Sequence, residues 1–494
     1  MFATNTPPQG TIRTWLNHRA NSDGVAFTFP DGEDDLTWSE LQSAAISIAS
    51  DLTTNGVQKG ESVAIIYPNC RDAVLAIYGT FYGGFRATMI NLVAGNDAIS
   101  YALEHSEARI AFVHDNALGL FEATKTDNLT YLDLNPNANQ IDLYDLTTED
   151  DALLMYTSGT TGRPKGVVHS QSSLLAGGWT TAVAHELNAQ DRGFCVLPIY
   201  HINGLCVSMM GALVSGGSIS MCSKFSASRF WQNSEQTKVT WFSVVPTIVS
   251  HLLHGKNEPT DETKARIRFG RSASSALAPD VQSAFEHRFG IPIIETMGLT
   301  ETAAQILSNP LPPATRKIGS PGIAFGNEIN IFNTNFEPCE PNIEGEIVVK
   351  GPNIMREYLK NPDATRNSFV REWLRTGDLG RMDEDGYVFV TGRLKELIIK
   401  GGENIAPREI DEALYSHPDV VEAAAFSVKC ERYGETVEAA VKLSEGSKID
   451  ADMLQDICQQ KLGNFKRPDK VHIMQDLPKG PSGKIQRAKI SALL

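Results

Sequence analysis

The sequence predicts an α/β protein in which a large N-terminal domain of layered, mostly parallel sheets with helices is followed by a small α+β C-terminal domain. Short apolar runs alternate with helical patterns over roughly the first 300 residues, which is typical of layered parallel sheets. After Gly319, short strand patterns split by Gly, Pro and Asn indicate a small β-rich subdomain. From about Lys395 the pattern changes again, and the remaining residues, about 100, are enough for a small domain. We therefore place the two domains at 1–393 and 394–494.

Helices and strands alternate in the N-terminal part. Thr37-Trp-Ser-Glu40 is a capping box, apolar residues recur at helical spacing between Leu41 and Leu52, and Asn55-Gly56 ends this helix. A short apolar run at 63–67 predicts a buried strand, and a helical pattern follows at 73–82. The same alternation predicts further strands at 110–114, 194–197, 240–245 and 291–295.

Two smaller units follow along the chain. The β-rich subdomain is expected to hold strands at 328–332, 344–350 and 386–391. In the C-terminal domain a helix is expected at 405–414, because Pro407 would lie in its first turn, where proline is tolerated. The other expected elements there are strands at 423–428 and 437–443 and a helix at 450–462 that ends at Gly463.

Composition and charge exclude several classes of protein. The chain has 494 residues, of which 41% are apolar and 21% charged, as in ordinary globular proteins, and about three structural units fit that length. A net charge of −15 argues against nucleic acid or an anionic membrane as a partner. Residues 204–222 carry no charge, but their glycines and serines favour a buried helix, a turn and a strand over a membrane span.

The cysteines and the N-terminal residues indicate a cytoplasmic protein. There are 7 cysteines, an odd number, and no C-x-x-C pair, which fits reduced thiols better than disulfides or a zinc site. The stretch 1–10 lacks the basic and apolar regions of a signal peptide. We therefore expect a cytoplasmic location.

Residues 156–166, YTSGTTGRPKG, make a loop suited to holding phosphate. Its glycines free backbone N–H groups, its Ser and Thr hydroxyls add donors, and Lys165 adds a positive charge. The loop is not the P-loop of nucleotide triphosphatases, because Pro164 stands at the second glycine of that motif and Gly166 at its Ser or Thr. We expect it to be something other than a hairpin turn, because a hairpin needs only two or three turn residues.

Seven motifs in a fixed order give the chain a resemblance to a known family. After the phosphate loop come LPIYHING (197–204), RSASSAL (271–277), MGLTE (297–301), WLRTGD (373–378), GRLKELIIKGGEN (392–404) and LPKGPSGK (477–484). The set resembles the AMP-forming adenylating enzymes, which include acyl-CoA synthetases, nonribosomal peptide adenylation domains and luciferases. A single motif of this kind is weak evidence, whereas seven in order are specific.

The resemblance implies an ATP site. Glu301 would bind Mg²⁺, which prefers one or two carboxylates together with phosphate oxygens, and Thr300 would lie beside the α-phosphate. Asp378 would accept hydrogen bonds from the ribose, and Arg393 would reach the ribose or a phosphate. Met297 stands where the family usually has an aromatic residue that stacks on adenine, and its sulfur can still cover a ring face. The other residues expected to bind ATP or AMP are Thr157, Ser158, Gly159, Thr160, Thr161, Gly162 and Lys165 at the phosphates, Ser274, Ser275 and Ala276 at the adenine, and Thr296 and Gly298.

The resemblance also implies two half-reactions served by a mobile C-terminal domain. Lys484 is expected to be catalytic, because a lysine that bridges the carboxylate and the α-phosphate offsets their repulsion and stabilises charge in the transition state. Lys395 stands at the position where the family has its hinge. Rotation of the C-terminal domain about Lys395 would remove Lys484 from the active site and bring in Gly401 and Gly402. Because these glycines have no side chains, they leave room for the pantetheine arm of CoA.

The implied activity is that of an ATP-dependent acid–CoA ligase with Mg²⁺ as cofactor and ATP and CoA as cosubstrates. A carboxylate and ATP would give acyl-AMP and pyrophosphate, and CoA would then give acyl-CoA and AMP. Two alternatives stay open. One is an adenylation enzyme that loads an acyl or aryl group onto a carrier protein, and the other is a non-catalytic regulator that binds AMP or acyl-AMP.

The acid is expected to be small. RSASSAL and SNPLP (308–312) resemble the oxalyl-CoA synthetase branch. Where that branch has a histidine that binds the second carboxylate of oxalate, this chain has Ala303-Ala304-Gln305. The departure favours a different small acid, with Ala304 facing it. His201 heads the expected acyl pocket, and both a substrate contact and a structural role are open for it.

Overall fold

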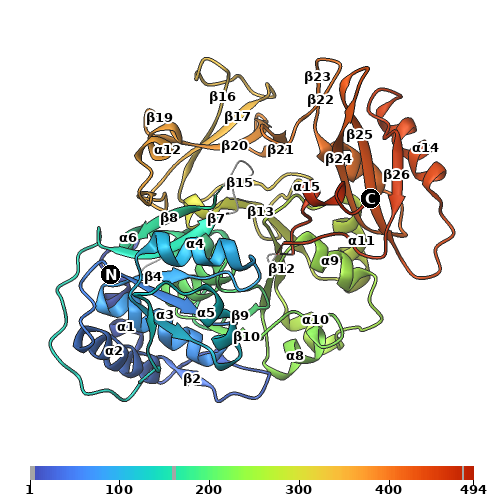
Figure 1. Cartoon of the computed structure of the whole chain (residues 1–494). Helices are drawn as coiled ribbons and strands as arrows, with labels where there is room; N and C mark the ends of the chain where they lie inside the picture. The colour runs from blue at the N-terminus through green and yellow to red at the C-terminus, as the bar shows by residue number, and fades with distance from the viewer. Residues whose placement is uncertain (1–5, 158–162, 481–482) are drawn as a thin grey trace.

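Two large sheets with helices between and outside them form the N-terminal part of the chain (Figure 1). The structure is a computed structural model and describes residues 6–157, 163–480 and 483–494. The seven-stranded sheet is parallel from β7 to β6. Its order is β18 (Glu357–Tyr358), β8 (Lys165–Ser170), β7 (Asp151–Thr157), β4 (Arg86–Met89), β3 (Ser62–Ile66), β5 (Ile110–Val113) and β6 (Thr130–Tyr131).

The nine-stranded sheet is parallel from β13 to β1 and antiparallel at both edges. Layered and mostly parallel sheets are therefore confirmed. The strand order is β15 (Ile323–Ala324), β14 (Ala304–Ser308), β13 (Ile293–Leu299), β12 (Phe269–Ser272), β11 (Trp241–Val244), β9 (Arg192–Cys195), β10 (Ser218–Met221), β1 (Val25–Thr28) and β2 (Leu36–Thr37).

The helices form layers on the faces of these sheets. One apolar core joins strands of both sheets to the helices between them, α1 (Ile12–Arg19), α2 (Trp38–Thr54), α3 (Arg71–Gly83), α6 (Gln171–Ala184) and α7 (Gly211–Ser215). A second core covers the other face of the nine-stranded sheet with α8 (Phe230–Gln236), α9 (Pro246–Leu253) and α11 (Pro279–Phe289), and α10 (Asp261–Arg266) packs on α8. A third covers the other face of the seven-stranded sheet with η1 (Asp115–Ala117), α4 (Asn96–Ser106) and α5 (Leu118–Thr124).

Two smaller sheets follow in the chain, as the changes of pattern after Gly319 and at about Lys395 predict. The first is antiparallel and contains β16 (Glu328–Phe332), β17 (Gly345–Lys350), β19 (Phe369–Val370), β20 (Trp373–Met382) and β21 (Val388–Arg393), with α12 (Pro362–Asn367) beside it. The second contains β22 (Ile398–Lys400), β23 (Glu403–Ile405), β24 (Val420–Cys430), β25 (Gly434–Leu443) and β26 (Lys470–Ile473), with α13 (Pro407–Tyr415), α14 (Ala451–Leu462) and α15 (Arg487–Ile490).

Local signals in the sequence locate these elements closely. The capping box at Thr37 forms, with the Thr37 side chain accepting from the Glu40 N–H and the Glu40 carboxylate accepting from the Thr37 N–H, and α2 ends before Asn55. Pro407 begins α13, and Gly463 follows α14. The beginning and end of these helices can therefore be predicted from capping residues, prolines and glycines that lie within a few residues of each helix end.

The expectation against a hairpin at the phosphate loop is wrong. β7 and β8 are antiparallel neighbours, and Thr157 pairs directly with Lys165. The loop between these two residues therefore joins the two strands of a hairpin. Hairpin loops longer than the two-residue turn also occur, and loop length alone does not exclude strand pairing on its two sides.

The uncharged segment 204–222 forms a buried helical stretch, a turn and a strand, as predicted. It begins as a π-type helix, η2 (Asn203–Met210), continues as α7, and turns at Gly216 (φ 79°) into β10. The π-type spacing was not expected, although such turns are frequent at functional sites. Among the described residues, no helix is both long enough and apolar enough to cross a membrane.

Candidate active site

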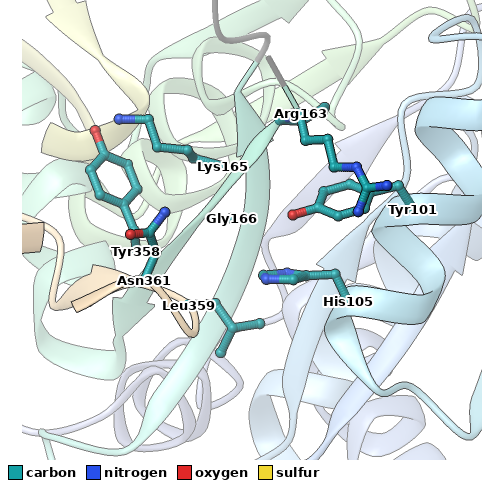
Figure 2. A pocket seen from close by; sticks show the side chains of 9 residues that line it. Tyr101, His105, Arg163, Lys165, Gly166, Tyr358, Leu359 and Asn361 are labelled. Carbon is teal, nitrogen blue, oxygen red and sulfur yellow. The ribbon is translucent and has the colours of Figure 1, made fainter. Parts of the chain in front are cut away.

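The base of the phosphate loop lies against the β18 edge of the seven-stranded sheet. Lys165 begins β8, and its Nζ lies 4.0 Å from the centre of the Tyr358 ring, which is a cation–π contact. Burial lowers the pKa of Lys165, and the nearby Glu301 carboxylate opposes this effect. Figure 2 shows Lys165 and Arg163 directed to opposite faces of β8, with Arg163 over Tyr101. Thr157 ends β7, whereas Ser158, Gly159, Thr160, Thr161 and Gly162 lie outside the described residues.

Glu301 presents one free carboxylate oxygen close to this lysine. Its Oε1 accepts a hydrogen bond of 2.7 Å from the Tyr358 hydroxyl, and among the described residues its other oxygen has no hydrogen-bond donor. No group of three or more His, Cys, Asp or Glu side chains in the described parts of the chain could hold a metal ion by itself. One carboxylate beside a phosphate loop fits Mg²⁺, which takes most of its ligands from phosphates and water.

The main chain at Thr300 is fixed by a buried histidine that the sequence analysis did not assign. His169 Nε2 lies 2.7 Å from the Thr300 carbonyl oxygen, so this nitrogen donates the hydrogen, and Nδ1 faces the Ser173 hydroxyl at 3.1 Å. Burial lowers the pKa of His169 to about 4, which keeps the ring neutral near pH 7. Its position at the end of the GVVH stretch that follows Lys165 is the signal that could have found it.

The strand before Thr300 approaches its neighbour closely. Gly298 of β13 lies so near β14 that a Cβ placed on it would be 1.6 Å from the Ala304 carbonyl oxygen. Thr296 and Met297 precede it, Thr296 is buried, and its hydroxyl donates to the Ser272 carbonyl oxygen at 3.3 Å. Ser274, Ser275 and Ala276 follow the end of β12, and Thr296 to Gly298 lie past the last parallel pair of β12 with β13, Ser272 with Glu295. Both groups are therefore at the carboxyl end of the parallel strands, the usual ligand edge of an open α/β sheet.

Asp378 and Arg393 face each other across β20 and β21. They are register partners, and Arg393 Nε lies 3.4 Å from Asp378 Oδ1. Burial raises the pKa of Asp378 above its ordinary value, while the positive charges of Arg393 and Lys484 act in the opposite direction. Lys484 is therefore close enough to affect this carboxyl group, although more than 100 residues separate the two in sequence.

The loop that carries Lys484 is held against the N-terminal part of the chain. Thr247 of α9 donates a hydrogen bond of 3.1 Å to the Gly483 carbonyl oxygen, and Gly483 has a φ of 79°. Burial lowers the pKa of Lys484, and the carboxylates of Glu396 and Asp378 oppose this effect. In this orientation of the C-terminal sheet, Lys484 therefore lies close enough to Asp378 and Arg393 for their charges to affect it.

The same orientation leaves the residues expected at CoA away from this site. Gly401 and Gly402 form the exposed turn between β22 and β23, at the outer end of the C-terminal sheet in Figure 1. Lys395 lies in the exposed turn between β21 and β22. The structure therefore brings together Lys484, Asp378 and Arg393, and it does not bring Gly401 and Gly402 to them.

His201 and Ala304, the residues expected at the acyl group, are accompanied by a buried polar cluster. Ala304 begins β14 and is 4% exposed. His201 precedes η2, burial lowers its pKa to about 4, and its buried Nε2 has no hydrogen-bond partner among the described residues. Beside them Arg271 of β12 contacts side chains of η2, β11 and β14. The motif that begins with Arg271 was recognised in the sequence, but no role was assigned to Arg271 itself.

The sequence and the structure are similar to those of known proteins over nearly their whole length. The family model of AMP-binding enzymes matches residues 15–359, and the model of the C-terminal domain of AMP-binding enzymes matches 409–484. The chain is 43% identical over 476 residues to a sulfoacetate–CoA ligase of Cupriavidus necator, covering 93% of both chains. It is 34% identical to an oxalate–CoA ligase of Arabidopsis thaliana, covering 94% of this chain and 96% of the relative.

A solved structure shares the architecture. It is that of the O-succinylbenzoate coenzyme A synthetase of Bacillus subtilis in complex with ATP and a magnesium ion. The TM-score is 0.85 at 30% sequence identity, and the match covers 97% of this chain and 99% of that one.

Proposed function

The chain belongs to the AMP-binding enzyme family, and on that premise we propose that the residues around Asp378 and Lys484 form its adenylation site. The protein is an ATP-dependent, AMP-forming acid–CoA ligase. In the first half-reaction a carboxylate oxygen of the acid attacks the α-phosphorus of ATP, and pyrophosphate leaves. In the second, the thiol of CoA attacks the acyl carbonyl, and AMP leaves.

The observation that carries the proposed site is the meeting of Lys484, Asp378 and Arg393. Asp378 would accept hydrogen bonds from the ribose hydroxyls, and Arg393 would reach the ribose or a phosphate. Lys484 would then lie where the carboxylate meets the α-phosphate. A positive charge held between two anions in a buried site stabilises the charge that develops in the transition state, and the site needs no reorganisation to supply it.

The other end of the nucleotide is assigned to the phosphate loop. We propose that Lys165, Thr157 and the loop between them hold the β- and γ-phosphates, while Thr300 lies at the α-phosphate. The hydrogen bond from His169 keeps the Thr300 main chain in place. Ser274 to Ala276 and Thr296 to Gly298 would surround the adenine.

Mg²⁺ fits this arrangement through Glu301. Its free carboxylate oxygen would complete a coordination shell made mostly of phosphate oxygens and water. When bound, the ion would neutralise negative charge on the pyrophosphate that leaves. The Tyr358 hydroxyl, by binding the other oxygen of Glu301, orients the carboxylate.

The second half-reaction needs a different orientation of the C-terminal part. We propose a domain boundary at residues 393 and 394 and rotation about Lys395, which lies in the turn between β21 and β22. The two family models, which end at 359 and begin at 409, support a division in this interval. Rotation would withdraw Lys484 and bring Gly401 and Gly402 toward the acyl-adenylate, where CoA must enter.

We propose a short carboxylic acid as the substrate. Relatives named for sulfoacetate and oxalate, both two-carbon acids, are similar over nearly the whole chain. A panel of short acids with ATP, Mg²⁺ and CoA tests the proposal by release of pyrophosphate and AMP and by formation of a thioester. We expect all three products with at least one acid. Pyrophosphate without CoA-dependent thioester would point instead to transfer to a carrier protein, and no pyrophosphate with any acid would contradict the proposal.

A further inference from the structure

Arg271 is a fully buried cation without a carboxylate partner among the described residues. Its side chain lies in β12, and the residue is 1% exposed. Nε donates to Gln305 Oε1 at 3.1 Å, and Nη1 donates to Asn203 Oδ1 at 2.8 Å and to Ser243 Oγ at 3.1 Å. All three acceptors are neutral, and no hydrogen bond from Nη2 is recorded to any described residue.

The positive charge of this guanidinium is uncompensated. Burial lowers the pKa of Arg271 to about 9, so the group is still protonated near pH 7. Among the described residues, the one ionisable group that acts on it favourably is the Cys206 thiol, and burial raises the pKa of that thiol so that it carries no charge near pH 7. Beside it, His185 is also neutral, because burial lowers its pKa to about 3. A buried ion without a counter-ion is strongly unfavourable, and buried charges in proteins are usually paired with a charge of opposite sign. An anionic ligand would supply that partner.

The surrounding side chains hold the guanidinium in one orientation. His185 Nε2 lies 3.1 Å from Gln305 Oε1, the oxygen that also accepts from Arg271. The Ser243 hydroxyl donates to Asn203 Oδ1 at 3.2 Å. The cluster is thus built from η2, β11, β12 and β14, four elements that are distant in sequence, and it presents a fixed cation.

The cluster adjoins the proposed adenine and acyl positions. Asn203 Nδ2 donates to Ser274 Oγ at 3.2 Å, which links the cluster to the loop proposed at the adenine. Gln305 follows Ala304, the residue expected to face the acid. Ser243 and Arg271 lie toward the carboxyl ends of two neighbouring parallel strands, β11 and β12. An acid whose carboxylate reaches the α-phosphate therefore has its other end near this cluster.

We propose that the acid substrate carries a second anionic group, a sulfonate or a carboxylate, and that Arg271 binds it with support from Asn203, Ser243 and Gln305. This inference rests on the proposed adenylation site. Arg271 would select the substrate, because a neutral acid leaves its guanidinium buried and unpaired. Sites built to pair with a polar group discriminate strongly against analogues that lack it.

Matched acids test the inference on the unaltered enzyme. Sulfoacetate is compared with methylsulfonylacetate, which replaces one sulfonate oxygen by a methyl group and removes the charge. Malonate is compared with its monomethyl ester. We expect kcat/KM for AMP formation to be higher for the dianion of at least one pair by about 10²-fold or more. The pair that shows the larger ratio identifies the sulfonate or the carboxylate as the group bound.

The two proposals fail in different ways in this assay. If neutral acids give AMP and thioester as efficiently as their dianionic partners, the inference about Arg271 is wrong and the ligase function stands. If no acid in the panel gives AMP, the ligase proposal itself is contradicted, and the inference falls with it.

Variants then connect the preference to the residue. Arg271→Gln should lower kcat/KM for the dianion by about 10²-fold and reduce the dianion-to-neutral ratio, while Arg271→Lys should retain part of that ratio. Arg268→Gln is the control, because Arg268 precedes the same strand and pairs with Asp191. It should leave the ratio unchanged. An unchanged ratio in a folded Arg271→Gln variant, as judged by thermal unfolding, would overturn the assignment.

Discussion

Lys484 is a half-buried ammonium group with carboxylates nearby from both sides of the proposed domain boundary. Asp378 comes from β20 and Glu396 from the turn before β22, and both raise its pKa against the larger effect of burial. Among the described residues, carboxylates thus act on Lys484, against the charges of Arg393 and Arg487, whereas no carboxylate acts on Arg271. When the domain rotates, Glu396 would move with Lys484, whereas Asp378 would stay behind.

At this scale we predict that Lys484→Ala separates the two half-reactions. Loss of one charge-stabilising group typically costs 10²–10³ in rate, so adenylation should fall by about that factor. Supplied with pre-made acyl-adenylate and CoA, the variant should form thioester at close to the normal rate, because that step does not use Lys484. Single-turnover assays of each half measure both rates.

The control for this variant is Lys489→Ala. Lys489 is exposed in α15, in the same terminal segment, and its loss should change neither half-reaction. Equal losses in both half-reactions for Lys484→Ala would rule out the two-orientation scheme for this enzyme.

Among the elements, β13 and β14 form a close pair that positions three of the proposed site residues. Thr300 and Glu301 lie in the short helix η3 (Thr300–Thr302) between these strands, and Ala304 begins the second one. Gly298 permits the approach, because any side chain would collide with the Ala304 carbonyl oxygen. Register shifts at this point of the ladder as well, which marks an irregular and sterically restricted pairing.

We predict that Gly298→Ala destabilises the fold and impairs adenylation. A backbone oxygen at 1.6 Å cannot move aside alone, so the strands must separate, at a cost on the order of 1–3 kcal/mol or more. Denaturant unfolding measures the stability, and pyrophosphate release measures the activity. Gly119→Ala is the control, because Gly119 lies in α5 with no atom near the added Cβ, and it should be neutral or stabilising. Normal activity and stability in Gly298→Ala would show that β13 and β14 can move apart without a loss in the free energy of unfolding, which would contradict the prediction.

At the scale of the whole molecule, α9 of the N-terminal part docks on β24 of the C-terminal sheet. Glu422 is buried at this contact, and its Oε1 lies 2.7 Å from both His251 Nε2 and Lys479 Nζ. Ser250 donates to the Val421 carbonyl oxygen, and His254 Nε2 donates to that of Pro418 at 3.0 Å. These contacts stabilise the orientation in which Lys484 meets Asp378.

We predict that Glu422→Gln weakens this docked orientation. Hydrogen bonds to charged groups contribute about 1.5–3 kcal/mol each. Loss of the carboxylate charge that binds His251 and Lys479 should therefore slow adenylation, and it should spare or accelerate thioester formation. Single-turnover assays of the two halves measure this bias. A loss confined to thioester formation would contradict a role for this contact in the adenylation orientation.

The same contact predicts a dependence on pH. Burial alone would raise the pKa of Glu422, but the hydrogen bonds and charges of His251 and Lys479 outweigh it and leave the pKa below the ordinary value. The contribution of Glu422 to docking is therefore complete above the ordinary carboxyl pKa and is lost as the pH falls through the lowered one. The ratio of the two half-reaction rates should shift toward thioester formation at acid pH in the wild type and less so in Glu422→Gln.

Lys395→Pro should have the opposite bias to Lys484→Ala. In this orientation no backbone hydrogen bond from the Lys395 N–H to a described residue is recorded, so proline removes none there. Fixing φ at this position and restricting Leu394 should hinder the rotation that follows adenylation. Adenylation should stay near normal while thioester formation slows, and a variant in which both rates are normal would place the hinge elsewhere.

The sequence by itself determined the elements and the chemistry of single motifs. Capping residues, breakers and apolar periodicity act within a few residues, so α2, α13 and α14 follow from local patterns, and the order of seven motifs was sufficient to place the chain in its family. Local patterns do not show which strands pair, and for this reason the expectation at the phosphate loop is wrong: loop length does not reveal that Thr157 pairs with Lys165.

Only the tertiary structure decided which of these residues meet. Lys484 lies near Asp378 because the C-terminal sheet docks on α9. The orientation of one domain on the other cannot be inferred from a sequence motif. Arg271 stands in a motif of the sequence, but its burial beside Asn203, Ser243 and Gln305, with no carboxylate partner among the described residues, depends on how η2, β11, β12 and β14 pack together. Burial and charge compensation are properties of neighbours in space, and the free energy of an ion is set by those neighbours rather than by its place in the chain.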